Sequence, residues 1–328
     1  GETALSAAEG SLPIELVEER AGPHARMNES APGGTPLSAA EGALPIELVE
    51  VRPGRMLAVH ARVRPGSTHT LVFVHGSAAS MLQWGGQIER FSTAHSVVAF
   101  DAYGCGRSPK PRDWDAYSFD ALTADLIAVL KCVIPPGSTP VLVAHSAGCS
   151  LAIAAVAAGL DAGAAEVQGL CLLGGYVEPP VPHPVFYLPV PLLNLIQPIL
   201  SSGFESLALH AETRAGKTDA HRSLLALAAQ VNGSNSMYMC KAYYRQLSAP
   251  PPHDVVRVGS AVPSLVISGE ADGLIAPVKS LALAQLLASA AGRPPAVHTV
   301  PRTSHQLMQE DPAAVNELIA TFVAGLRR

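Results

Sequence analysis

The sequence lacks the features that mark several classes of protein, and each gap excludes a function. No apolar run reaches the roughly 18 to 20 residues that a membrane-spanning helix needs, so no transmembrane segment is expected. No group of histidines and cysteines has zinc-site spacing and no Gly-rich phosphate loop is present, so we expect neither a metal nor a cofactor. The formal net charge of −5 gives no basic patch, which argues against a nucleic-acid partner.

Cysteine is also scarce. The five cysteines are an odd number without paired spacing, although one disulfide would be compatible with the count. This pattern predicts reduced, mostly buried thiols and an intracellular protein, cytoplasmic or organellar. Because the chain begins at Gly1 without a methionine, we expect that any targeting peptide of the natural protein is missing from it.

An internal repeat occupies the N-terminus of this 328-residue sequence. Residues 4–20 recur as residues 36–52 with 14 of 17 positions identical, and two copies are too few for a solenoid. We interpret the repeat as a duplication without a role. The alternative is that the first copy competes with the second for the same sheet edge, or is exchanged between protomers. The second copy continues into an expected strand at 46–51 and a returning strand at 56–63, so residues 1–43 are assigned to an N-terminal tail.

Short apolar segments alternate with helical ones along the rest of the chain. The length of 328 residues fits one large α/β domain or two smaller ones, and 48% hydrophobic residues are enough for a buried core. The segments with strand character are 71–74, 96–100, 141–144, 169–173, 264–268 and 296–300, and those with helical spacing are 119–132, 147–159, 276–290 and 312–326. Such alternation predicts an α/β fold with a mostly parallel sheet, buried on both faces by helices.

The most specific motif is Ala144-His145-Ser146-Ala147-Gly148, which follows an expected strand and precedes an expected helix. A serine between small residues at such a turn is typical of a nucleophile elbow, although Ala144 stands where glycine is usual. A serine hydroxyl is a weak nucleophile at neutral pH, so it needs a general base and a group that orients the base.

Candidates for both partners follow later strands. Asp272 comes just after the strand at 264–268, and His305 comes just after the strand at 296–300. The carboxyl ends of parallel strands share one edge of a sheet, where open α/β sheets assemble their sites. We therefore assign Ser146, Asp272 and His305 as the catalytic residues, with Glu270 and Glu178 left open as alternative acids.

Two backbone amides are expected to form an oxyanion hole. Ala147, the residue after the nucleophile, should provide one amide. Ser77 should provide the other, because the strand at 71–74 continues into His75 and Gly76, and glycine lets this loop pass close to a substrate.

These segments resemble the α/β-hydrolase fold superfamily, above all eukaryotic abhydrolase-domain proteins and the lipase/esterase and epoxide-hydrolase-like branches. The matching segments are Phe73–Ser77, Asp101–Ser108, Ala144–Gly148, Gly269–Asp272 and Ser304-His305, and the resemblance covers residues from about 44 to 328. It implies an eight-stranded, mostly parallel sheet with a helical cap inserted after strand six. Epoxide and haloalkane enzymes use an aspartate nucleophile, so Ser146 favours acyl transfer to water, with Asp101 in a structural role.

The stretch 178–258 breaks the alternation of strands and helices and is where the family places its cap. We therefore expect a core of residues 44–177 and 259–328 and a cap of residues 178–258 over an apolar pocket. The residues expected to bind substrate there are His75, Gly76, His145, Phe186, Tyr187, Leu192 and Met237.

The sequence thus predicts a serine hydrolase that cleaves carboxylic esters, with an apolar ester as its small-molecule partner. Peripheral membrane contact is kept as an additional hypothesis, and the oligomeric state is not predicted. Three alternatives stay open: hydrolysis of carbon–carbon bonds in β-diketones, a cofactor-free haloperoxidase-like activity, and a binding or scaffold protein with a vestigial site.

Overall fold

The computed structural model describes residues 45–163, 167–290 and 294–326, and it is built around an eight-stranded sheet. The strand order is β1-β2-β4-β3-β5-β6-β7-β8; β2 is antiparallel to β1 and β4, and the other neighbours are parallel. The strands are β1 (Glu47–Arg52), β2 (Arg55–Arg62), β3 (His69–Val74), β4 (Ser96–Asp101), β5 (Thr139–His145), β6 (Gly169–Leu173), β7 (Ser264–Gly269) and β8 (Ala296–Val300). The predicted fold class is confirmed, whereas the predicted N-terminal tail and the first repeat copy lie outside the described residues.

The central strands explain why the sequence shows short continuous apolar runs. Every residue of β3, β4, β6 and β7 is buried, because helices cover both faces of the sheet. Strand β8 departs from the expectation of two buried faces, since four of its five residues are exposed. It is the last strand of the sheet, so it has a neighbour on one side only.

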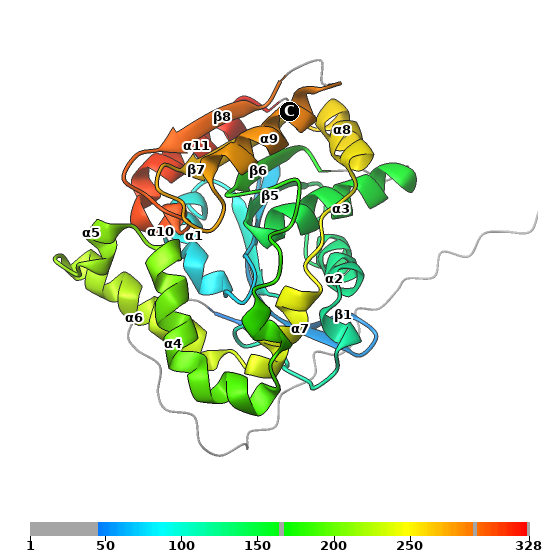
Figure 1. The fold of residues 1–328 in the computed structure, drawn as a ribbon. Helices are drawn as coiled ribbons and strands as arrows, with labels where there is room; N and C mark the ends of the chain where they lie inside the picture. The colour runs from blue at the N-terminus through cyan, green and yellow to red at the C-terminus, as the bar shows by residue number, and fades with distance from the viewer. Residues whose placement is uncertain (1–44, 164–166, 291–293, 327–328) are drawn as a thin grey trace, which may run out of the picture. The chain divides into compact units, whose positions relative to one another are not determined.

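Two helical layers enclose the sheet (Figure 1). On one face lie α2 (Phe119–Cys132), α3 (Ala147–Asp161), α8 (Pro252–Ala261) and α9 (Pro277–Ala288), and on the other lie η2 (Met81–Trp84), α1 (Gly85–Phe91), α10 (Leu307–Glu310) and α11 (Pro312–Ala324). The alternation of β3 side chains divides the core: Val72 and Val74 pack in the first layer, and Leu71 and Phe73 in the second.

A helical insertion separates β6 from β7 (Figure 1, green to yellow). It contains η4 (Pro184–Tyr187), α4 (Val190–Ala208), α5 (Ala211–Arg214), α6 (Asp219–Ser234) and α7 (Met237–Arg245). Its helices begin where the sequence offers N-caps: Thr218 accepts from the amide of His221, and Ser236 accepts from the amide of Met239.

The predicted end of the cap, residue 258, falls within helix α8 (Pro252–Ala261). Helix α8 lies largely inside the predicted cap, yet it packs against α3 and α9 in the layer that covers the sheet. Val255 and Val258 of α8 are buried in that core, which accounts for the position of the helix.

Candidate active site

Ser146 lies at a sharp turn between β5 and α3. Its φ of 54° and ψ of −124° fall in a region that non-glycine residues rarely adopt, and α3 starts at the next residue. Gly148 makes this turn possible, because a Cβ atom there would lie 2.7 Å from the carbonyl oxygen of His75. The strained turn presents the serine, which is 7% exposed, to the large cavity described below.

Asp272 and His305 meet at the carboxyl edge of the sheet, after β7 and β8. The Nδ1 atom of His305 lies 2.8 Å from Oδ2 of Asp272, and both residues are buried. A carboxylate only accepts hydrogen bonds, so Nδ1 carries the proton and Nε2 of the neutral ring is left as an acceptor. The second carboxylate oxygen accepts from the amides of Leu274 and Ile275, which hold the aspartate in place.

The two alternative acids are placed differently. Glu270 is exposed and accepts a hydrogen bond from the amide of Arg302. Glu178 is exposed in the segment that follows β6. Of the three carboxylates considered from the sequence, Asp272 is the one that the structure brings to His305.

His145, directly before the serine, contacts His305 as well. Its Nε2–H donates to the backbone oxygen of His305 over 2.9 Å, and the two rings are in contact, tilted at 48° with centroids 4.5 Å apart. Burial, followed by the charge of His305, keeps the pKa of His145 well below its usual range. His145 is therefore a neutral donor that braces the segment carrying His305.

The loop after β3 approaches the serine from the other side. Gly76 is required at this approach, since a Cβ atom there would lie 3.0 Å from the Cβ of Ser146. Gly76 and Ser77 line the cavity, and Ala147 follows the serine at the start of α3. Of the two residues expected to donate to an oxyanion, Ala147 directly follows Ser146, and Ser77 directly follows Gly76, the residue that approaches the serine.

His75 differs from the expectation of a substrate contact. Its Nδ1–H donates to the carbonyl of Gly76 over 2.7 Å, and its Nε2 accepts from the amide of Ala102 over 2.9 Å. Burial lowers its pKa, opposed by the charge of Asp101. Both ring nitrogens of His75 are hydrogen-bonded to the backbone, so the residue joins the loop after β3 to the end of β4. His75 does not line the cavity.

Asp101 supports the same loop. One carboxylate oxygen accepts from the Ser80 hydroxyl and the Met81 amide, at 2.8 and 2.7 Å, and the other accepts from the Arg107 amide at 2.8 Å. Gly106 has a positive φ of 49°, and a Cβ atom there would lie 2.0 Å from this carboxylate. Three backbone or hydroxyl donors occupy Asp101, in agreement with a structural role.

A cavity of about 720 Å³ lies between the core and the insertion and reaches Ser146 and His305. Its wall is mostly apolar, and η4, α4, α6 and α7 contribute a large part of it. Of the four insertion residues expected to bind substrate, Phe186 and Met237 line the cavity.

The other two, Tyr187 and Leu192, do not line it. Tyr187 is exposed, with the guanidinium of Arg245 4.4 Å from its ring centroid, and Leu192 is exposed on α4 while its neighbour Leu193 is buried. A continuous apolar run does not indicate which of its side chains point outward.

The structure adds cavity residues that the sequence analysis missed. Asn235 donates through Nδ2 to the carbonyl of Ala78 and so connects the insertion to the loop after β3. Tyr244 stacks on Phe186 with ring centroids 4.7 Å apart, and burial raises its pKa. Gln83 of η2 points Nε2 at Nδ1 of His145, 3.5 Å away. No motif marks these residues, because each acts on a segment distant in the sequence.

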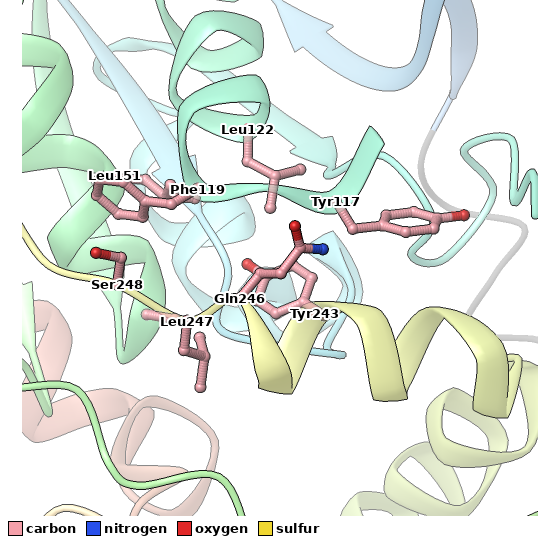
Figure 2. A pocket seen from close by; sticks show the side chains of 9 residues that line it. Tyr117, Phe119, Leu122, Leu151, Tyr243, Gln246, Leu247 and Ser248 are labelled. Carbon is pink, nitrogen blue, oxygen red and sulfur yellow. The ribbon is translucent and has the colours of Figure 1, made fainter. Parts of the chain in front are cut away.

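A second, much smaller pocket of about 10 Å³ lies where α7 meets the core (Figure 2). Figure 2 shows the amide of Gln246 rising from the end of α7 toward Leu122 of α2. Its Nε2 donates to the carbonyls of Trp114 and Ala242, at 2.8 and 3.1 Å. The space suits about one water molecule, so this pocket is a packing seam between α7 and the core.

The remaining candidate nucleophiles are the cysteine thiols. All five cysteines are free, and burial raises the pKa of Cys149, whose thiol contacts the carbonyls of Ala144 and Leu173. Among the residues that the structure describes, no three His, Cys, Asp or Glu side chains gather as metal ligands. None of the described helices combines the length and hydropathy needed to cross a membrane.

Comparisons with known proteins agree with this fold. Residues 71–318 match the model of the alpha/beta hydrolase family. Protein ABHD8 of Bos taurus is 26% identical over 259 residues, which cover 77% of this chain and 55% of that protein, so the chain spans about half the length of the curated relatives it matches.

Solved structures share the fold at low sequence identity. A putative aryl esterase from Burkholderia cenocepacia has a TM-score of 0.69 at 22% identity, covering 85% of this chain and 98% of the esterase. A bromoperoxidase from Bacillus anthracis has a TM-score of 0.67 at 16% identity, covering 85% of this chain and all of that chain.

Proposed function

Because the chain belongs to the alpha/beta hydrolase family, we propose that it is a serine hydrolase that cleaves lipophilic carboxylic esters. The observation that carries the proposal is the 2.8 Å contact of Asp272 with His305, a residue that lines the same cavity as the strained Ser146. The esterase among the structural neighbours supports hydrolase chemistry on this fold.

In the proposed reaction, Ser146 attacks the ester carbonyl while Nε2 of His305 removes the hydroxyl proton. Asp272 holds the ring in the tautomer that leaves Nε2 free and stabilises the imidazolium that forms. The amides of Ser77 and Ala147 bind the oxyanion of the tetrahedral intermediate. His305 then protonates the leaving alcohol, and a water molecule that it deprotonates releases the acid and restores Ser146.

The substrate class follows from the cavity. About 720 Å³ is within the range of pockets that enclose a small molecule, and its wall is predominantly apolar. An acyl chain or another lipophilic group would lie against the insertion, with the ester carbonyl at Ser146. The volume and the apolar wall favour this class over small polar esters.

The proposal is tested by labelling with a fluorophosphonate probe and by hydrolysis of a panel of p-nitrophenyl esters. Ser146→Ala should lose labelling and lower turnover by about a million-fold, because the nucleophile is gone and only oxyanion stabilisation remains. Ser289→Ala, at an exposed helix end, is the matched control and should label like the natural protein.

Each alternative function has its own outcome. Turnover of dienone acids without ester turnover would indicate a carbon–carbon hydrolase, and bromination without ester turnover would indicate a haloperoxidase-like enzyme. A well-folded protein that the probe never labels would be a binding or scaffold protein. Labelling of Ser146→Ala at the natural level would refute the nucleophile.

A further inference from the structure

Helix α4 has a broad apolar surface, part of which is buried and part of which is exposed to solvent. On the inner side, Leu193 is fully buried, and Ile196 and Leu200 pack against the core. On the outer side, at helical spacing, Leu192, Leu195 and Ile199 are 47%, 77% and 73% exposed, and Leu188 lies exposed just before the helix. We call Leu188, Leu192, Leu195 and Ile199 the outer face.

The outer face is unusual for a helix that meets water. Helices on the surface of globular proteins place polar and charged residues on the solvent side. Over its 19 residues α4 has a single charged residue, Glu205, near its C-terminal end. A contiguous exposed apolar patch of this kind marks a surface that contacts another apolar phase.

Cations lie at the N-terminal end of the outer face. Lys241 donates through Nζ to the carbonyl of Leu188 over 2.7 Å. The guanidinium of Arg245 lies 4.4 Å from the ring centroid of Tyr187, the residue before Leu188. Leucine and isoleucine on one face, flanked by an aromatic ring and by cations, is the composition of a helix that lies in a lipid interface.

The outer face is also continuous with the cavity. Val181, Ile199 and Leu207 are exposed to solvent and line the cavity at the same time. An alkyl chain that leaves a lipid surface at this face would therefore meet apolar side chains on its way to Ser146. A surface built only to bind another protein would not need this continuity.

We infer that the outer face docks on a phospholipid surface. The four apolar side chains enter the boundary between head groups and acyl chains, and Lys241 and Arg245 contact anionic head groups. Docking needs no bond cleavage, so it can be tested independently of the proposed hydrolase activity.

Cosedimentation with vesicles tests the inference, with Ser146→Ala as the parent protein so that no lipid is cleaved. Vesicles of phosphatidylcholine alone are compared with vesicles that contain about 20 mol % phosphatidylserine. We expect the parent to bind both and to bind the anionic vesicles about 25-fold more tightly, because Lys241 and Arg245 each contribute about fivefold.

Leu195→Glu should lower the partition coefficient about tenfold or more, since it removes one buried leucine from the contact. Leu195→Ser should weaken binding without adding a charge. Val278→Glu on α9 is the matched control: Val278 is 68% exposed and lies on a core helix, so binding should stay at the parental level. Thermal melting shows that each variant is folded.

Three results would overturn the inference: no binding by the parent, equal binding by Leu195→Glu and the parent, or equal loss with Val278→Glu. Concentration-dependent dimerisation that Leu195→Glu abolishes, without vesicle binding, would instead identify the outer face as an interface between copies. In the background with Ser146 restored, Leu195→Glu should hydrolyse soluble esters at the natural rate, which separates failure of docking from failure of the hydrolase proposal.

Discussion

Hydrogen bonding separates Asp272 from the other two candidate carboxylates at the residue scale. Its Oδ2 faces Nδ1 of His305 at 2.8 Å, and its Oδ1 is held by two backbone amides. Glu270 is engaged with the amide of Arg302 at the surface. An acid that orients the histidine must touch it, and this geometry favours Asp272.

Asp272→Asn should lower the turnover number for esters by about ten-thousand-fold, because an amide can stabilise the wrong tautomer of the imidazole. Stopped-flow or long-incubation assays with p-nitrophenyl butyrate measure the loss. Glu270→Gln is the matched control and should change turnover little. A larger loss in Glu270→Gln or Glu178→Gln than in Asp272→Asn would assign the acid elsewhere.

Buried histidines make the stability of the protein depend on pH. The pKa values of His145 and His75 are lowered in the folded state, chiefly by burial, whereas both rings titrate near 6.5 in the unfolded chain. Below about pH 6.5 the unfolded state therefore binds protons that the folded state does not bind. The free energy of unfolding falls with falling pH, by up to about 1.4 kcal/mol per pH unit for each histidine.

Urea denaturation between about pH 7.5 and 5.5 measures this slope. His145→Gln should have a shallower slope than the natural protein, since one titrating group is gone. Ile267→Val, a core change without a titrating group, should cost about 0.5–1.5 kcal/mol at every pH and keep the slope. Identical slopes in His145→Gln and the natural protein would show that His145 is not held neutral by the fold.

The sequence pointed to individual residues of the site only where a local motif exists. Ser146 is recognisable because the strained turn allows small neighbours only, and the structure shows the reason at Gly148. Asn235 and Gln83 carry no such constraint. Each reaches the site through a contact across the fold, 157 and 62 positions away in the sequence, which a single sequence does not reveal.

At the scale of elements, the hairpin of β1 and β2 is tied to α2 by a buried ionic cluster. The carboxylate of Asp125 in α2 accepts hydrogen bonds from Nε of Arg52 at 2.7 Å and from Nε of Arg55 at 2.9 Å. The guanidinium of Arg55 also lies 3.6 Å from the centroid of the Tyr103 ring. The antiparallel edge of the sheet is thus joined to its helical layer by charge as well as by apolar contact.

Asp125→Asn should reduce the free energy of unfolding by about 3–5 kcal/mol, because it leaves the buried Arg55 without its counter-charge. Asp219→Asn provides the comparison: Asp219 pairs with Arg222 on the exposed side of α6, where loss of the pair should cost at most about 1 kcal/mol. Denaturant titration measures both. Equal, small losses in the two variants would mean that the buried cluster adds no stability.

Strands with two buried faces have the clearest sequence pattern. Strands β3 to β7 are short apolar runs because helices cover both sides, and the pattern is visible without a structure. Helix α1 begins with Gly85-Gly86, residues that disfavour helices, and tertiary packing of Ile88 and Phe91 decides its formation. Helix α8 was assigned to the cap because its position depends on contacts with α3 and α9 rather than on its own sequence.

At the scale of the whole molecule, the core and the insertion enclose the cavity together. Helix α7 is fastened to the core by Gln246, and Asn235 ties the end of α6 to the loop after β3. Helices α4 and α6 contribute further residues to the wall of the cavity. The insertion should therefore select the part of a substrate that lies away from the scissile bond.

Esters with medium or long acyl chains should have higher kcat/KM than acetate esters. Each buried methylene contributes about 0.8 kcal/mol, so three more buried methylenes should raise kcat/KM by tens of fold until the cavity is filled. A p-nitrophenyl ester series from acetate to decanoate measures the trend.

Ala228→Phe, which adds a ring to the cavity wall on α6, should move the optimum to shorter chains. Ala226→Phe, exposed on the same helix, should leave the optimum in place. Equal kcat/KM for acetate and octanoate in all three proteins would show that the insertion does not select the acyl chain.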